Sequence, residues 1–182
     1  YFKDVNGFIL ESVEHNKSIE SYKLCIEKLI NLNLDKQSTI IAIGGGIVCD
    51  FAGFVAATYK RGTKLILVPT TFLAQVDASI GGKNGLNYLS TKNMIGTIRL
   101  PDEVVINTEF LTTLPMDEII NGFAEVIKIS TIYNLKLFEY LENFELPTDN
   151  EWTGSLSIKI LVSELIRLKM QIVSKDTFDN GI

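Results

Sequence analysis

The sequence predicts an α/β protein in which a Rossmann-like parallel sheet forms a nucleotide domain and an all-helical domain follows. Three observations predict it. Buried-strand patterns alternate with helix patterns over the first 110 residues or so, three glycines join one strand to the next helix, and no strand-like alternation follows Pro115. Strand, helix and strand in that order imply parallel pairing through helical crossovers. We place the domain boundary near residues 110–116, which gives domains over 1–114 and 115–182.

The elements follow from the spacing of apolar residues along the chain. Spacings of three and four predict an amphipathic helix, and short continuous apolar runs predict buried parallel strands. The predicted elements are a helix over 18–32, a strand over 39–43, a buried helix over 47–59, strands over 64–69 and 103–107, and helical regions over 116–144 and 152–174.

Composition excludes several classes of protein. The 182 residues carry a net charge of −5, which provides no field for binding nucleic acid or an anionic membrane, so neither is an expected partner. Two cysteines without a C-x-x-C motif indicate a reducing compartment, and no apolar run approaches about 20 residues, so we expect a cytoplasmic protein. His15 is the only histidine, so several imidazole ligands for one metal cannot come from these residues.

The run from Ile40 to Asp50 is the most informative segment, because a buried strand ends in Gly44, Gly45 and Gly46 and a helix begins directly after them. Such glycines let the chain turn sharply and expose its N–H groups, and the helix dipole favours an anion there. We expect Asp50, in the first turn, to accept hydrogen bonds from ligand hydroxyls. The spacing departs from G-x-G-x-x-G, so an ordinary strand-to-helix turn stays an alternative to a nucleotide site.

Polar residues gather between the second and third predicted strands. Thr70 and Thr71 end a strand, where open α/β sheets bind ligands. Beyond them, Asp77 and a run of glycines, amides and lysines follow, and this run includes Lys83, Lys92 and Asn93. Either these residues form a solvated loop, or the lysines and amides converge on a phosphate or carboxylate, which Arg61 could join.

A third cluster lies on the predicted helix after Pro115. Glu125 and Lys128 are three residues apart and therefore share a helix face. They form either an ordinary surface ion pair or, because their neighbours are apolar, a functional carboxylate that faces a cleft.

At this point the chain resembles the 3-dehydroquinate synthases of the sugar phosphate cyclase group. The matching strings are GGGIVCDFAGFVAATYKRGT (44–63), VPTTFLAQVDASIGGKNGLN (68–87), KNMIG (92–96), TLPMDEIINGFAEVIK (113–128) and, more weakly, EHNKSIE (14–20). The resemblance implies an enzyme that depends on NAD and a divalent metal, zinc or cobalt, and converts 3-deoxy-arabino-heptulosonate 7-phosphate to 3-dehydroquinate plus phosphate in the shikimate pathway. It also implies transient oxidation of a ring carbinol, elimination of phosphate, return of the hydride and aldol closure.

The resemblance implies a role for each matching residue. The cofactor contacts are Glu14, Lys17, Gly45, Gly46, Asp50, Thr70, Thr71, Phe110, Thr113, Leu114 and Asp117. The substrate set is Asp77, Lys83, Lys92, Asn93 and Lys128, with Lys169 as a looser match. Glu125 matches the carboxylate that binds the metal. Arg61 matches an arginine that reaches phosphate in a neighbouring subunit, which implies a homodimer.

The departures from the family pattern qualify these expectations. Family members are about twice as long, and their two histidine metal ligands fall beyond Ile182, so we expect an internal fragment, truncated at both ends and inactive alone. Tyr88, Asp117 and Thr91 differ from the residues usual at those positions. Two alternatives stay open: a related sugar phosphate cyclase or metal-dependent polyol or glycerol dehydrogenase, and a noncatalytic nucleotide-binding module.

Overall fold

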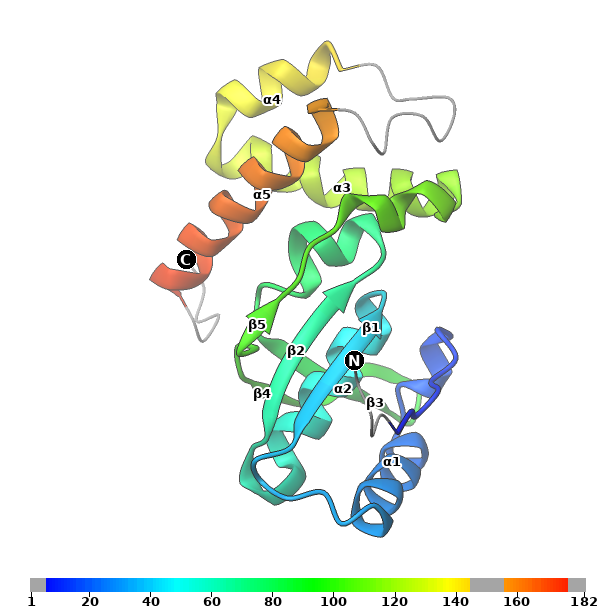
Figure 1. Ribbon diagram of the computed structural model, residues 1–182. Helices are drawn as coiled ribbons and strands as arrows, with labels where there is room; N and C mark the ends of the chain where they lie inside the picture. Colours follow the sequence, from blue (N-terminus) through cyan, green and yellow to red (C-terminus); the bar gives the residue numbers. More distant parts are fainter. Residues whose placement is uncertain (1–5, 145–155, 177–182) are drawn as a thin grey trace.

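A three-stranded parallel sheet forms the centre of the first half of the chain (Figure 1). The computed structural model describes residues 6–144 and 156–176. Strands β1 (Thr39–Gly44), β2 (Lys64–Pro69) and β5 (Glu103–Val104) pair in the order β1-β2-β5. The register places Gly44 opposite Pro69, so both longer strands end at the same edge of the sheet. The predicted α/β class is confirmed.

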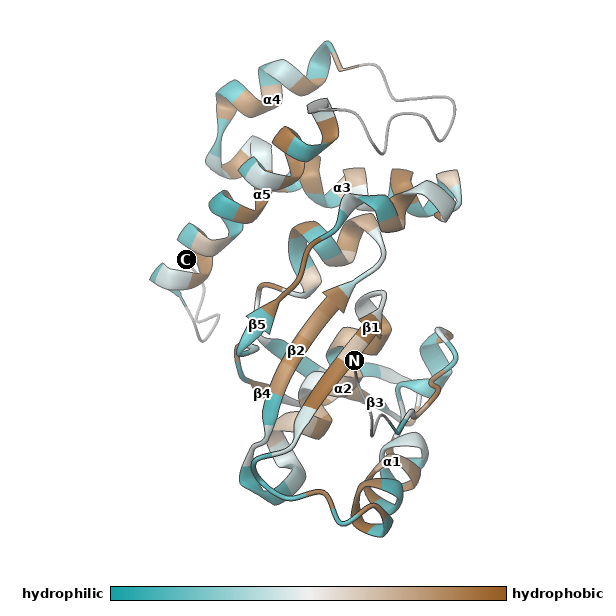
Figure 2. Cartoon of the chain, viewed as in Figure 1, coloured by the Kyte–Doolittle hydropathy of each residue, from teal (hydrophilic) through white to brown (hydrophobic). Residues whose placement is uncertain are grey.

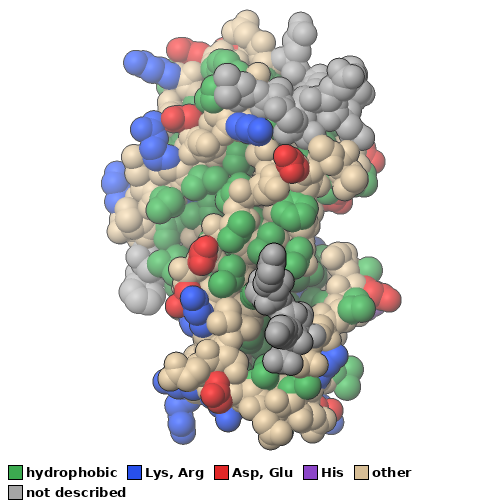
Figure 3. All heavy atoms as spheres, viewed as in Figure 1, with side chains coloured by type: hydrophobic (Ala, Val, Ile, Leu, Met, Phe, Trp, Pro, Cys, Tyr) green, Lys and Arg blue, Asp and Glu red, His purple; other side chains and the backbone are tan. Residues whose placement is uncertain are grey.

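Helix α2 (Gly46–Thr58) covers one face of this sheet. Alternate strand residues point to opposite faces, and Ala42, Leu65 and Leu67 pack against alanines of α2. On the other face Ile41 and Ile43 are 45% and 62% exposed. Figure 2 shows β1 and β2 as hydrophobic strands, and Figure 3 shows hydrophobic side chains across the middle of this side of the molecule.

Helix α1 (Ile19–Asn31) confirms the helix that the periodicity over 18–32 predicts. It lies beside α2. Its N-cap is Ser18, whose hydroxyl accepts a hydrogen bond from the N–H of Ser21. Cys25 of α1 shares a core with Phe51 and Phe54 of α2. A single 3-10 turn, η1 (Glu14–Asn16), leads into α1 and holds Glu14 and Lys17 near the start of α2.

The polar segment after Asp77 is not a loop, and this corrects one of our two interpretations. It forms an antiparallel hairpin of β3 (Lys83–Tyr88) and β4 (Thr91–Ile98). Strand β3 packs on α2, and Leu86 is fully buried between them. The third predicted strand is also shorter than expected: β5 ends at Val104, although the N–H of Val105 still donates to Leu67 O (2.8 Å).

The remainder of the described chain is helical, as predicted. A π-helical turn η3 (Ala74–Ala78) and 3-10 turns η2 (Tyr59–Arg61) and η4 (Thr108–Thr113) precede three helices. These helices are α3 (Met116–Tyr133), α4 (Leu135–Glu142) and α5 (Leu156–Lys175). The helical region predicted over 116–144 is divided because Asn134 leaves helical geometry and caps α4 through its side chain. Residues 152–155 lie outside the described residues.

One core joins this helical half to the end of the sheet. Phe72 and Val76 from the η3 segment and Leu111 from η4 pack with residues of α3 and α5. Gly122 makes this possible, since a Cβ there would lie 2.5 Å from the ring of Phe72. Among the described helices, none is both long and apolar enough to cross a membrane.

Candidate functional site

The glycine loop leads straight from β1 into α2. Gly45 occupies the N-cap position without a side-chain cap, and α2 begins at Gly46. The N–H of Thr70 donates to Gly44 O (2.9 Å), and a Cβ on Gly45 would lie 2.9 Å from Thr71 Cγ2. The two predicted segments, Gly44–Gly46 and Thr70–Thr71, therefore meet at the edge of the sheet where both strands end. Backbone N–H groups and the helix dipole suit this place to a phosphate.

Gly46, Asp50 and Gly53 form a stripe along α2, because residues i, i+4 and i+7 share a helix face. The structure corrects one detail here: α2 begins at Gly46, so Asp50 lies beyond the first turn rather than within it. Burial raises the pKa of the Asp50 carboxyl, and a hydrogen bond from Lys17 partly offsets that effect. The stripe thus presents a carboxylate between two positions without side chains.

Lys17 connects this stripe to the hairpin. Its side chain is 4% exposed, and Nζ lies 2.8 Å from Asp50 Oδ2, 2.5 Å from Asn93 Oδ1 and 4.0 Å from Glu14 Oε1. The side-chain amide of Asn87 donates to Glu14 Oε1 (2.8 Å), and this hydrogen bond is the main reason why the pKa of Glu14 is lowered. A buried ammonium group with three oxygen partners ties η1, α2 and the hairpin together.

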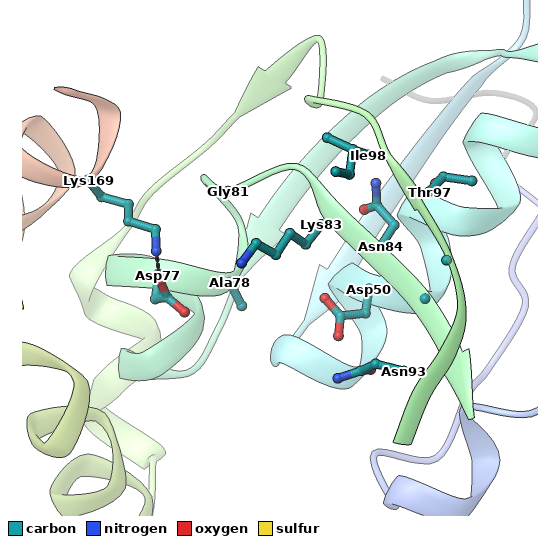
Figure 4. A pocket seen from close by; sticks show the side chains of 12 residues that line it. Asp50, Asp77, Ala78, Gly81, Lys83, Asn84, Asn93, Thr97, Ile98 and Lys169 are labelled. Atoms are coloured by element: carbon teal, nitrogen blue, oxygen red, sulfur yellow. Dashed lines mark ion pairs between the residues drawn. The ribbon is translucent and has the colours of Figure 1, made fainter. Parts of the chain in front are cut away.

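A cavity of about 510 Å³ lies between the α2 stripe, the hairpin and α5. The sequence predicts five of its lining residues: Asp50, Asp77, Lys83, Asn93 and Lys169. Figure 4 shows Lys83 extending toward Asp77, while Lys169 of α5 forms an ion pair with that carboxylate. Asp50 and Asn93 lie on the other side of Lys83. Two ammonium groups, two carboxylates and two side-chain amides therefore line one cavity, a set suited to a substrate that carries anionic groups and hydroxyls.

Lys92 does not line this cavity. Its ammonium group lies 3.8 Å from Glu14 Oε2, and its side chain is 70% exposed on the outer side of the hairpin. Asn93 lines the cavity, and its φ of +53° marks an irregular point in β4 directly after Lys92. Arg61 lies on η2, beyond the C-terminal end of α2, and does not line the cavity either. Its φ of +63° follows that of Lys60 (+47°), so the backbone there adopts a left-handed conformation that such residues rarely take.

Glu125 and Lys128 form an ion pair on α3 with a separation of 2.6 Å. The side chain of Glu125 is only 15% exposed, so this carboxylate is not directed into bulk water. The hydrogen bond that Lys128 donates to Glu125 raises the pKa of Lys128, and the charge of Asp77 adds to the effect. Within residues 6–144 and 156–176, no three histidine, cysteine, aspartate or glutamate side chains gather around one point. Glu125 therefore offers one metal ligand, and the described residues alone do not form a metal site.

The last predicted cofactor contacts lie above the sheet edge. Phe110 and Thr113 are on η4, Leu114 follows it, and Asp117 is in the first turn of α3. They do not line the cavity; Phe110 is 37% exposed, Leu114 is partly buried, and Thr113 and Asp117 are exposed. The side chain of Gln75, which donates to Pro69 O (3.2 Å) and Asn107 O (2.9 Å), joins η4 to the end of β2.

The polar run predicted from the sequence contains Gly81, Asn84 and Gly85, but sequence reasoning missed the lining residues that β4 supplies. These are Gly96, Thr97 and Ile98, and Ala78 before the hairpin was missed as well. Two glycines that face each other across a strand pair, Gly85 and Gly96, are a signal for close backbone approach in a hairpin. Only knowledge of that pairing places Gly96 and Thr97 opposite Gly85 and Asn84 at the cavity wall.

The comparisons with known proteins agree with this arrangement. The family described as 3-dehydroquinate synthase N-terminal matches residues 7–121. A 3-dehydroquinate synthase of Streptococcus pyogenes serotype M49 is 44% identical over 166 residues, which cover 91% of this chain and 45% of that protein. A 3-dehydroquinate synthase of Natranaerobius thermophilus is 41% identical over 184 residues, with coverages of 99% and 49%. The chain spans about half the length of the curated relatives it matches.

Solved structures of similar fold include two synthases that were solved with NAD+ and a divalent metal. A 2-epi-5-epi-valiolone synthase from Streptomyces hygroscopicus, solved with NAD+ and Zn2+, has a TM-score of 0.85 at 23% identity and covers 94% of this chain and 48% of its own. A 2-deoxy-scyllo-inosose synthase, solved with carbaglucose-6-phosphate, NAD+ and Co2+, has a TM-score of 0.78 at 26% identity. It covers 93% of this chain and 46% of its own. The arrangement of sheet, hairpin and helices is therefore that of this group of folds.

Proposed function

Because the chain belongs to the 3-dehydroquinate synthase family, we propose that it forms the nucleotide-binding half, and part of the helical half, of an enzyme that converts 3-deoxy-arabino-heptulosonate 7-phosphate to 3-dehydroquinate and phosphate. One observation carries the proposal. The cavity brings a carboxylate beside the glycine loop together with two lysines and an amide from three other elements. A substrate with phosphate, carboxylate and hydroxyl groups needs this mixture of partners.

The cofactor we propose is NAD, bound at the glycine loop. The loop suits a dinucleotide because Gly45 and Gly46 keep the first turn of α2 clear of side chains, and only Ala78 Cβ, at 3.6 Å, lies near where a Cβ of Gly46 would be. Solved relatives of this fold contain NAD+. NAD would supply reversible oxidation of a ring carbinol, which makes the neighbouring C–H more acidic. Asp50 would accept hydrogen bonds from ribose hydroxyls, and Lys17 would keep Asp50 ionised.

The substrate would bind on the hairpin side of the cavity. Lys83 and Lys169 would hold its anionic groups, since ammonium groups form strong charge-assisted hydrogen bonds with phosphate and carboxylate. In the structure Lys169 pairs with Asp77, so a substrate would share this lysine with Asp77. Asn93 would bind a hydroxyl through its amide. Lys128 and Lys92 belong to the same proposed set, and Lys92 would have to leave Glu14 to take part.

A divalent metal, zinc or cobalt, is proposed with Glu125 as one ligand. The described residues hold no group of three ligands, so the others would come from outside the part of the chain that the structure describes. For the same reason we do not expect these 182 residues to turn over substrate alone. A homodimer is proposed in addition: Arg61 is exposed and lies away from the cavity of its own chain, so it would reach the phosphate in a second subunit.

The experiment uses the complete gene product with NAD, zinc and 3-deoxy-arabino-heptulosonate 7-phosphate, and follows phosphate and NADH together. Release of phosphate without accumulation of NADH is the expected result. Steady accumulation of NADH would instead indicate a polyol or glycerol dehydrogenase. Binding of NAD without either product would leave only a nucleotide-binding module.

A further inference from the structure

We propose that Asn84 is a positioning residue, which docks the β3–β4 hairpin on Gly53 of α2 and thereby sets the place of the Lys83 ammonium group in the cavity. The inference deepens the proposed function and rests on it, because it concerns how the same cavity holds its anionic ligand. Asn84 is 8% exposed and directly follows Lys83. Lys83 is exposed and extends into the cavity, whereas the side chain of Asn84 is buried against α2 at the cavity wall.

The side-chain amide of Asn84 closes the neck of the hairpin. Its Nδ2 donates to Gly82 O (2.8 Å) before β3 and to Arg99 O (3.0 Å) after β4. The N–H of Arg99 also donates to Gly82 O (2.8 Å). Gly82 has a φ of +67°, and a Cβ there would lie 2.9 Å from Leu100 Cδ2, so the turn that precedes Lys83 is tightly constrained. The path of the chain into Lys83 is therefore fixed by a buried side-chain amide that donates hydrogen bonds to two backbone carbonyl groups.

Gly53 provides the space that this arrangement needs. A Cβ at position 53 would lie 1.7 Å from Asn84 Oδ1 and 2.4 Å from its Cγ, so the amide lies directly on the helix backbone. Gly53 is also the end of the stripe that contains Asp50. Docking Asn84 at this point places the start of β3 at a defined distance from the Asp50 carboxylate. The contact between Gly53 and Asn84 thus fixes the position of the Lys83 side of the cavity relative to the Asp50 side.

The test compares Asn84→Ala and Gly53→Ala in the complete gene product. Each change should raise the KM for the phosphorylated substrate and the inhibition constant of inorganic phosphate about 10- to 100-fold, as a small displacement of a binding group does. The dissociation constant of NAD should stay within about twofold, because the glycine loop at the start of α2 is untouched. Ser90→Ala, at the exposed tip of the same hairpin, is the matched control and should leave both constants unchanged.

The double variant separates positioning from a general loss of stability. With alanine at position 84 the contacts of 1.7 and 2.4 Å with a Cβ at position 53 are removed, and only the Cβ of residue 84 stays near, at 3.1 Å. Adding Gly53→Ala to Asn84→Ala should therefore change the KM much less than Gly53→Ala does alone. If Asn84→Ala does not fold, Asn84→Ser keeps a small donor at the site and should show the same effect on KM in weaker form. An unchanged KM, with only a lower melting temperature or a smaller active fraction, would overturn the positioning role. Absence of phosphate release from the wild-type protein would instead refute the proposed function itself.

Discussion

Replacing Lys17 by methionine tests the buried charge network directly. The ammonium group has a side chain that is 4% exposed and lies 2.8 Å from Asp50, whose own side chain is 23% exposed. Removing one partner of a fully buried ion pair costs about 3–5 kcal/mol, because the other charge is left without compensation. Asp50 keeps some contact with water, so we expect Lys17→Met to lower the free energy of unfolding by about 2–3 kcal/mol.

The assay is urea denaturation of the complete gene product. The free energies of unfolding of the variant and the wild type are compared with one common value for their dependence on urea concentration. Lys23→Met is the matched control: Lys23 lies 3.9 Å from Glu27, but the two side chains are 74% and 53% exposed. That pair should contribute less than about 0.5 kcal/mol. Lys17→Met/Asp50→Asn should be more stable than Lys17→Met alone, since no unpaired carboxylate then remains.

The effect of Lys17→Met should depend on pH. Burial raises the pKa of Asp50 in the folded state above its unfolded value, so stability falls as the pH rises through the folded-state pKa. Loss of Lys17 removes the interaction that lowers this pKa, so the cost of ionising Asp50 grows. The deficit of the variant should therefore be greatest near neutral pH and shrink toward about pH 3, where the carboxyl is largely protonated in both states. A loss no greater than that of Lys23→Met, or one independent of pH, would refute this reasoning.

Three further predictions concern the glycine loop, the metal ligand and the cysteines. Gly45→Val should weaken NAD binding at least about tenfold in equilibrium titrations, because the valine side chain would meet Thr71 and fill the loop. Gly7→Ala is the control and should not weaken it, since a Cβ at position 7 would have nothing within 4 Å. Equal NAD affinities of the two variants would place the cofactor elsewhere. Glu125→Gln should lower the amount of metal bound per chain, as measured by elemental analysis. Glu164→Gln is the control and should leave the metal content unchanged, because Glu164 forms a comparable ion pair (2.7 Å) with Arg167 on α5. Unchanged metal content in Glu125→Gln would remove Glu125 from the ligand set. Both cysteines are buried, and burial raises the pKa of Cys49 to about 12. Neither thiol should therefore react with a thiol reagent at about pH 8 until the protein is unfolded. Rapid reaction of the native protein would contradict the packing around α2.

The parallel sheet and α2 could be predicted from the sequence because their signals are local. Apolar runs define β1 and β2, and three glycines define the turn into α2. The hairpin could not be predicted, since β3 is rich in polar residues and glycine, which have low strand propensity. Its stability comes from packing, with Leu86 buried against α2 and Asn84 resting on Gly53. Such contacts join residues about thirty positions apart and leave no periodic pattern.

The candidate site, too, could be predicted from the sequence only in part. Residue types that bind anions and hydroxyls identified Asp50, Asp77 and Lys83, and the structure brings them to one cavity. The position of Lys92 could not be read from the sequence, because Lys92 and Asn93 are neighbours and only the folded hairpin decides which of them lines the cavity. The buried partners of Lys17 were equally inaccessible, since three separate elements supply them.

The central claim is that this family member uses NAD as a cofactor that is regenerated within each cycle in the cavity described above. The most direct measurement supplies the complete gene product, loaded with zinc, with one equivalent of NAD per chain and a large excess of 3-deoxy-arabino-heptulosonate 7-phosphate. The account predicts that phosphate release continues through many turnovers for each NAD, with the NAD recovered oxidised at the end. Product formation that stops after one equivalent per NAD, with NADH left in solution, would contradict it.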